Sequence, residues 1–204
     1  MYSTKTATTN NTEFNSSYMP VGINENVTLK EVNVNKTPQG RDFLEIIFEN
    51  EQGQTATMTE WKNEKNMWIK TDEDLQNRDN QQFGRILQVI DCLGLRPEFE
   101  GSSFVEMINW TKGILEQYKN IDNKKLRLKV VYDKKGYTKV SSLGIFVEPM
   151  SVAKEESQIK LWKNDLLERP VQADVEKPVD PLAADTNSSA PVTADSTGAD
   201  DLPF

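Results

Sequence analysis

Residues 27–36 read Val-Thr-Leu-Lys-Glu-Val-Asn-Val-Asn-Lys. Apolar side chains occupy positions 27 and 29 in one phase and positions 32 and 34 in the other, so the apolar face changes sides in between. Successive side chains of a strand point to opposite faces, and one extra residue shifts that phase. The stretch therefore predicts a strand with a β-bulge near Lys30 and Glu31, where the strand bends sharply.

Two further strands follow along the chain. Thr37-Pro38-Gln39-Gly40 is typical of a turn, and Phe43–Glu49 then alternates with Leu44, Ile46 and Phe48 on one face. A second turn at 50–53 precedes the alternating stretch Thr55–Trp61. The spacing predicts three meandering antiparallel strands.

Two helices are predicted next. Acidic residues at 72–74 favour a helix N-terminus, apolar residues from Phe83 to Leu93 follow helical spacing, and Gly94 supplies a stop. Ser103 and Glu106 form a capping-box pattern for a second helix, whose apolar stripe runs from position 104 to 118. Aromatic residues and Met at this spacing indicate core packing rather than a ligand site.

The chain then returns to strands. Lys125–Tyr132 alternates, which predicts Leu126, Leu128 and Val130 inward and Lys125, Arg127 and Lys129 outward. A hairpin turn at 133–136 leads to a returning strand at Tyr137–Glu148.

Five strands, with a bulged first strand and helices between the third and fourth, predict a mainly β protein of the OB-fold barrel type. In that fold, strands 2 and 3 and the loops joining strands 1–2 and 4–5 bind oligonucleotides. Here these loops are residues 36–41 and 133–137, and each carries cations and a glycine.

Residues 124–139 hold seven Lys or Arg and one Asp, a net charge of +6. A single-stranded phosphate backbone requires such cations, and exposed bases require aromatic faces, among which Trp68 beside strands 2 and 3 is a further candidate. The predicted contacts with single-stranded DNA are Lys36, Arg41, Phe43, Trp61, Lys125, Arg127, Lys129, Tyr132, Lys134, Lys135, Tyr137 and Lys139. Two simpler explanations are that a Lys-rich strand only prevents edge-to-edge association and that Phe43 or Trp61 only packs against the helices.

Composition divides the chain into three parts. Residues 1–20 are rich in Ser, Thr and Asn and predict a flexible arm, and 21–169 form the folded domain. Residues 170–204 carry a net charge of −6 and five of the nine prolines, against a net charge of −2 for residues 1–169. Such a segment buries too little apolar surface to fold, so a disordered acidic tail is predicted.

The last residues are Asp200-Asp201-Leu202-Pro203-Phe204. This ending resembles the tail of single-stranded DNA-binding proteins, whose bacterial members end Asp-Asp-Ile-Pro-Phe. The resemblance covers the tail and the inferred barrel, and it implies a non-enzymatic protein that coats and protects single-stranded DNA in replication, recombination and repair. The roughly 60 residues between strands 3 and 4 and the N-terminal arm look more like a bacteriophage version. They leave a bacterial-type tetramer, and homo-oligomers in general, open.

The resemblance also implies how the tail works. Phe204 and its carboxylate would dock in an apolar pocket rimmed by Arg and Lys on a polymerase, primase-helicase or nuclease. Leu202 and Pro203 would form a stiff approach, and Asp200 and Asp201 would steer the encounter. The acidic tail could also compete with DNA for the basic stretch. An acidic tail that only increases solubility is the alternative, but it does not explain the Leu-Pro-Phe ending.

The composition excludes several chemistries. The chain has no His, which excludes His-based triads and His-ligated zinc, and Cys92 alone cannot form an intrachain disulfide. No cofactor is expected, and without an apolar stretch of membrane length or a signal peptide the protein is expected in the cytoplasm, that of the host if phage-encoded. Two alternatives stay open: a decoy that displays the tail without binding DNA, and, less favoured, a Mg²⁺ enzyme using Glu45 and Glu49. RNA binding is also left open.

Overall fold

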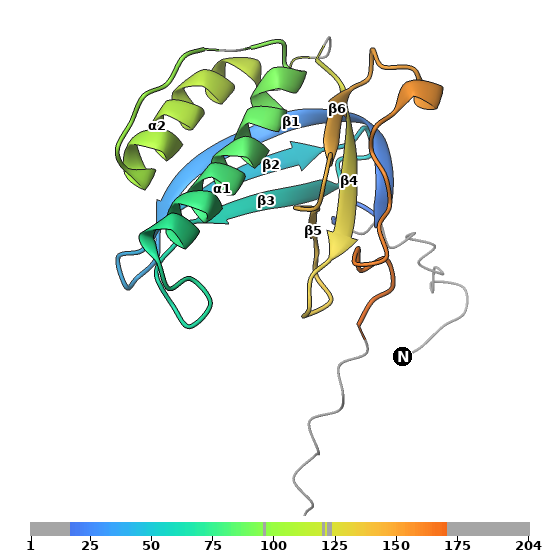
Figure 1. Cartoon of the computed structure of the whole chain (residues 1–204). Helices are drawn as coiled ribbons and strands as arrows, with labels where there is room; N and C mark the ends of the chain where they lie inside the picture. Colours follow the sequence, from blue (N-terminus) through green and yellow to red (C-terminus); the bar gives the residue numbers. More distant parts are fainter. Residues whose placement is uncertain (1–16, 96, 120, 122–123, 171–204) are drawn as a thin grey trace, which may run out of the picture. The chain divides into compact units, whose positions relative to one another are not determined.

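The computed structural model describes residues 17–95, 97–119, 121 and 124–170. This part of the chain is mainly β, with a sheet of six strands and two α-helices between the third and fourth strands (Figure 1). The strands are β1 (Gly22–Lys36), β2 (Asp42–Glu49), β3 (Thr55–Trp61), β4 (Leu126–Tyr132), β5 (Thr138–Val140) and β6 (Val147–Pro149). The helices are α1 (Asp72–Cys92) and α2 (Phe104–Leu115), with 3-10 turns at Glu116–Tyr118 and Lys154–Glu156.

All strand pairs are antiparallel, in the order β3-β2-β1-β4-β5, and β6 pairs with the same edge of β4 that β5 uses. Both helices lie on one side of the sheet (Figure 1), α2 against β1 and β2 and α1 against β6. Between them and the sheet lies one hydrophobic core, which includes the fully buried Phe48, Ile86, Ile108 and Phe146. Each such side chain contributes roughly 1.5–3 kcal/mol when it is removed from water.

The predicted β-bulge in the first strand is confirmed. The register of β1 against β2 runs from Leu29 opposite Phe48 to Glu31 opposite Ile47, so Lys30 is the extra residue. The bulge changes the phase of the strand, which lets Val27 and Leu29 and then Val32 all reach the core.

The predicted helix ends are also confirmed. Thr71 and Asp74 form a capping box at the start of α1, and Gly94 follows its end with a φ of 77°, a conformation that favours glycine. Ser103 caps α2 by accepting the amide of Glu106 at 3.2 Å. The Glu106 carboxylate accepts the amide of Ser102 at 2.8 Å rather than that of the cap residue itself.

The predicted returning strand at Tyr137–Glu148 is wrong. The chain forms only β5 and β6, and between them residues 141–146 leave the sheet opposite a single residue of β4, Lys129. The Lys129 amide donates to the Phe146 carbonyl at 2.8 Å, and its carbonyl accepts the Ser141 amide at 2.9 Å. Six residues therefore bulge out between two consecutive ladder bonds of β4.

A closed barrel is not confirmed, because the sheet is open. β3 and β5 come near each other, with pairs of Cα atoms within 8 Å, but no hydrogen-bonded ladder joins them in the described residues. The break after Val140 leaves β5 with three residues, too few to pair along the length of β3.

The folded part begins earlier than residue 21. Ser17 and Met19 form backbone hydrogen bonds of 2.9 Å with Thr55 at the start of β3, and the Met19 side chain is completely buried. The last residues of the predicted arm therefore belong to the folded sheet.

Candidate nucleic-acid interface

An aromatic pair lies at the neighbouring ends of β2 and β3. Phe43 and Trp61 are opposed in the antiparallel register, and their rings stack with centroids 4.3 Å apart and planes at 25°. Both belong to the strand phase opposite to the buried core residues, and Trp61 is 37% exposed. This pair, called here the aromatic platform, offers solvent the kind of flat ring on which nucleobases stack.

Arg41 holds a positive charge over the platform. Its guanidinium carbon lies 5.3 Å from the centre of the Trp61 ring, within the range of a cation–π interaction. The β1–β2 turn fixes this position, because the Arg41 amide donates to the Thr37 hydroxyl at 3.1 Å and Gly40 takes a φ of 82°. One guanidinium nitrogen also donates to the Lys62 carbonyl at 2.9 Å.

A buried polar cluster on the core side of β3 fixes the backbone of Trp61. Glu60 points inward and is almost fully buried, and its two carboxylate oxygens accept from Arg85 of α1 at 2.7 and 2.6 Å. The Gln82 amide donates to Glu60 at 2.9 Å and to the Trp61 carbonyl at 2.8 Å. Sequence reasoning missed these positioning residues. The available signal was an acidic side chain in the inward phase of Thr55–Trp61, since a buried carboxylate requires a partner.

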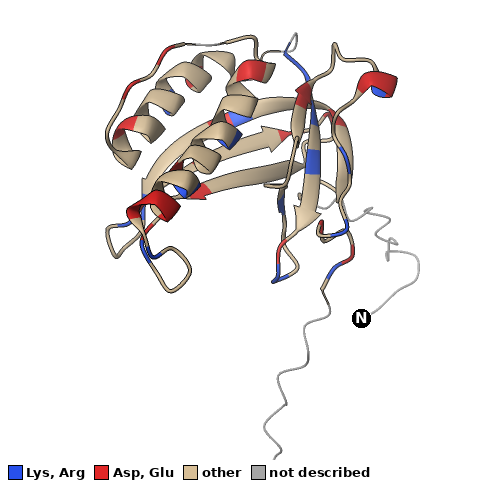
Figure 2. Cartoon of the chain, in the orientation of Figure 1, with Lys and Arg blue, Asp and Glu red and all other residues tan. Residues whose placement is uncertain are grey.

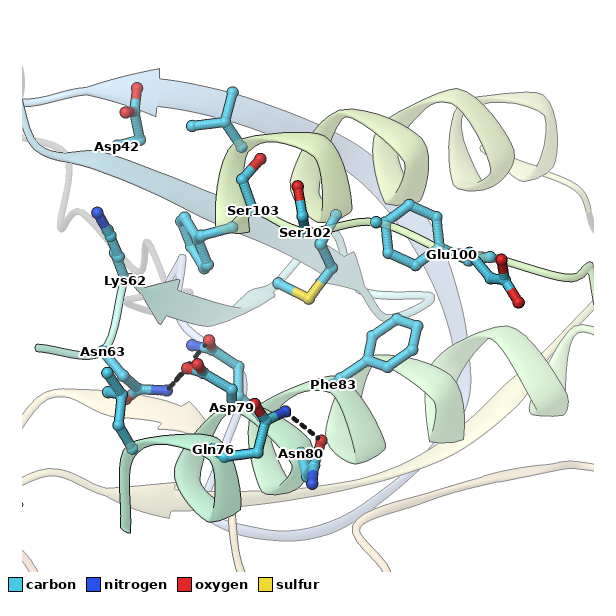
Figure 3. A pocket seen from close by; sticks show the side chains of 17 residues that line it. Asp42, Lys62, Asn63, Gln76, Asp79, Asn80, Phe83, Glu100, Ser102 and Ser103 are labelled. Atoms are coloured by element: carbon cyan, nitrogen blue, oxygen red, sulfur yellow. Dashed lines mark hydrogen bonds between the residues drawn. The ribbon is translucent and has the colours of Figure 1, made fainter. Parts of the chain in front are cut away.

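A cleft lies between the ends of β2 and β3, the first half of α1 and the start of α2 (Figure 3). Asp42 and Lys62 lie at one end of it and Glu100 at the other, while Asp79 accepts the side-chain amide of Asn63 at 2.9 Å. Three acidic residues and one lysine line this cleft, which makes it unsuitable for a phosphate backbone.

The predicted outward position of Lys129 is wrong. The side chain is completely buried, and its ammonium group donates to the carbonyls of Leu143 and Lys160 at 2.9 and 3.0 Å and to Asp165 at 3.0 Å. Asp165 also accepts the Ser141 hydroxyl at 3.1 Å. The face of β4 that alternation assigns to solvent is covered by the later segment 141–166, so Lys129 is a structural residue.

Arg127 is likewise buried, against the prediction. Its guanidinium forms an ion pair with Glu148 of β6 and a second with Glu25 at 3.3 Å. Burial raises the pKa of Glu148, but hydrogen bonds from the Ser157 side chain and from Arg127 outweigh it and hold that pKa below its usual range. The charged groups of Arg127 and Glu148 are therefore paired with each other inside the protein.

The predicted row of seven cations is thus divided. Lys124 donates to the Leu93 carbonyl at the end of α1 at 2.9 Å, and Lys125 pairs with Glu51 at 2.6 Å. Exposed side chains around the turn at 133–137 and on β5 are Lys134, Lys135, Tyr137 and Lys139, and Tyr132 is half-buried. Asp133 fixes the turn by accepting the amides of Lys135 and Tyr137 at 2.8 and 2.9 Å.

Among the cations predicted to contact DNA, two groups remain exposed on the surface. Lys36 and Arg41 lie at the β1–β2 turn, with Lys36 paired to Asp42 at 3.3 Å, and the other group surrounds the β4–β5 turn. The β4–β5 turn lies away from both helices, whereas the β1–β2 turn lies beside the loop that leads into α1 (Figure 1), and basic residues colour both turns (Figure 2). The structure therefore keeps the two predicted loops but removes Arg127 and Lys129 from the surface between them.

Burial raises the pKa of Cys92 to about 12, so its thiol stays protonated at neutral pH. In the part of the chain that the structure describes, no group of three or more Cys, Asp or Glu is placed to hold a metal ion. No helix among the described residues is long and apolar enough to cross a membrane. The predicted partner-binding residues Asp200, Asp201, Leu202, Pro203 and Phe204 lie outside the described residues.

No protein-family model matches the chain, and no curated protein sequence is significantly similar to it.

Proposed function

We propose that this chain is a non-enzymatic single-stranded DNA-binding protein that coats and protects exposed strands during replication, recombination and repair. The aromatic platform with Arg41 above it is the observation that carries the proposal. A stacked pair of rings with a cation beside it favours unpaired bases of any sequence, because every base has a π-face and every nucleotide a phosphate. A double helix hides its bases, so the same surface has little to bind there.

We infer further that the open sheet is a partly open OB-fold. The support is the strand order β3-β2-β1-β4-β5, the bulged β1, the helices between β3 and β4, and the approach of β3 to β5. An OB-fold is a five-stranded, partly open barrel whose strands 2–3 and loops 1–2 and 4–5 bind oligonucleotides. In this chain those parts carry the aromatic platform and the two groups of surface cations.

The C-terminal residues Asp200–Phe204 support a second part of the proposal. An acidic segment that carries an apolar ring suits an apolar pocket rimmed by Arg or Lys. We propose that this peptide recruits a polymerase, primase-helicase or nuclease to the coated strand. The long insertion between β3 and β4 and the tail together favour a bacteriophage protein that acts in the cytoplasm of the host.

The test is binding of oligo-dT measured by tryptophan fluorescence. In Trp61→Ala and Phe43→Ala, we expect affinity to fall about tenfold, because stacking contributes about 1–3 kcal/mol per base. The control is Trp162→Ala, which removes a half-exposed tryptophan from the C-terminal segment and should leave affinity unchanged. If the wild-type chain does not bind oligo-dT at low salt, the proposed function is wrong.

A further inference from the structure

Two large apolar side chains project into solvent from the loop between β3 and α1. Met67 is 73% exposed and Trp68 is 82% exposed, which makes Trp68 the more exposed of the two. Exposed Trp is costly in water, and Trp is enriched where proteins contact partners because it offers a large rigid surface. Packing among the described residues therefore does not account for the position of this ring.

The loop presents these side chains on a well-held turn. The Asn66 side-chain oxygen accepts the backbone amides of Trp68 and Ile69 at 2.8 and 3.1 Å. The backbone amide of Asn66 donates to the Ile69 carbonyl at 3.0 Å. The Ile69 side chain is buried and anchors the turn. Because three hydrogen bonds hold the backbone of the turn, a ligand that contacts Trp68 loses little free energy in ordering the loop.

The root of the same loop is joined to the aromatic platform. Lys62 directly follows Trp61, and its carbonyl accepts from Arg41 at 2.9 Å. Asn63 is held on the other side by Asp79 of α1 at 2.9 Å, as Figure 3 shows. The loop extends to the side of the molecule that also carries the β1–β2 turn (Figure 1). A strand bound on the platform therefore has the loop at the end of β3 as its next surface.

The charges around Trp68 indicate which part of a nucleotide it meets. The loop carries Lys62, Lys65 and Lys70 against Glu64, but Lys65 pairs with Asp72 at 2.6 Å and acidic residues open α1. The neighbourhood is thus close to neutral. A neutral surface attracts phosphates weakly, so the ring has to act through the base rather than through the backbone.

We propose that Trp68, with Met67 beside it, is a second stacking site for the bases of a single strand that lies on the aromatic platform. The proposal rests on the proposed function and extends the bound length of the strand beyond β3. It assigns the exposed ring to nucleobases because the loop is continuous with the platform and offers stacking surface without a basic field. A protein surface or a second copy of the chain is the competing occupant.

The experiment compares Trp68→Ala with the full-length wild-type chain on oligo-dT of about 4 and about 16 nucleotides, the range that one OB-fold covers. On the longer oligonucleotide we expect Trp68→Ala to weaken binding about tenfold, and on the shorter one, which the platform alone can hold, we expect no change. The slope of log K against log salt should stay the same, because no phosphate contact is lost. Trp68→Phe keeps a ring and should restore most of the affinity.

Trp61→Ala serves as the internal reference. If it weakens binding at both lengths while Trp68→Ala matches wild type at both, the second stacking site is wrong and the proposed function stands. If Trp68→Ala instead abolishes self-association seen by sedimentation and leaves DNA affinity intact, the ring belongs to an interface between copies. Absence of binding by the wild-type chain overturns the proposed function itself.

Discussion

Lys129 carries its charge in the interior because three oxygens surround the ammonium group. Two backbone carbonyls and Asp165 accept all three of its hydrogens, and its own amide and carbonyl hold the two ends of the 141–146 excursion. One residue thus joins β4 to the excursion and to the segment around Asp165. Lys129 therefore stabilises the fold, although a lysine at this position of an alternating strand favours a surface contact.

A substitution at Lys129 therefore affects stability before it affects binding. Lys129→Met leaves Asp165 buried without a counter-charge, and we expect the free energy of unfolding in urea to fall by about 3–5 kcal/mol. The control is Lys134→Met at the exposed β4–β5 turn, where a change within about 0.5 kcal/mol is expected. The double variant Lys129→Met, Asp165→Leu should recover much of the loss, because it removes both charges. Equal stability of the two single variants would contradict the buried ion pair.

The segment 141–166, which covers the outer face of β4, acts as one element. Its attachment combines the Arg127–Glu148 ion pair, the acceptance of the Gln158 amide by Glu148 at 3.1 Å, and the Lys129–Asp165 pair. The Tyr132 amide adds a bond to the Leu166 carbonyl at 2.8 Å. Charged groups thus do the work that apolar side chains do on the opposite face of the strand.

This attachment predicts an acid-sensitive element. Hydrogen bonds hold the pKa of Glu148 below its ordinary value of 4.5, so its contribution to stability is complete above about pH 4.5 and is lost as the pH falls through the folded-state pKa. We expect the urea midpoint of Glu148→Gln to depend less on pH than that of wild type between about pH 6 and about pH 3. Glu156→Gln, a change at an exposed carboxyl of the following 3-10 turn, should keep the wild-type profile. Identical profiles for all three proteins would contradict the assignment.

A second element-scale link connects α1 to the candidate interface. Gln82 and Arg85 reach from the helix to Glu60 and to the Trp61 carbonyl, so the helix sets the backbone position of the platform. Rings that stack on a ligand contribute most when their position is fixed beforehand. Helix α1 therefore helps to position the proposed binding surface.

Across the whole molecule the charge is strongly divided. Residues 1–169 carry a net charge of −2, and residues 170–204 carry −6. With Arg127 and Lys129 buried, fewer of the predicted cations reach the surface, so the proposed electrostatic attraction for DNA is weaker than the sequence predicts. On the proposed function, stacking on the platform then has to supply more of the affinity, and the proposed competition by the acidic tail becomes more important.

Removal of the tail tests this balance. We expect residues 1–169 to bind oligo-dT as tightly as the full chain or more tightly at low salt, and the difference to shrink near 0.1 M salt, where screening acts over about 10 Å. Recruitment of a partner enzyme should be lost. A full-length chain with residues 200–204 in shuffled order keeps the charge and should lose recruitment alone. Weaker DNA binding by residues 1–169 would contradict competition by the tail.

Charge reversal at Lys134, Lys135 and Lys139 with no effect on binding would favour the decoy, a protein that displays the tail without binding DNA.

Patterns within a few residues of one another were predictable from the sequence. The phase change at Lys30, the helix start at residues 72–74, the cap at Ser103 and the stop at Gly94 depend on local geometry, and the structure confirms each of them. The stacked partners Phe43 and Trp61 also follow from alternation, because a short antiparallel meander leaves few possible registers.

Contacts between distant parts of the chain decided the rest. Alternation in β4 identified two faces but could not show that residues 141–166 return to cover the second, which turns Arg127 and Lys129 from surface cations into buried ion pairs. The same return breaks the last strand and leaves the sheet open between β3 and β5. Side-chain periodicity shows that the two faces of a strand differ. Which of the faces is buried depends on the other segments of the chain that pack against them.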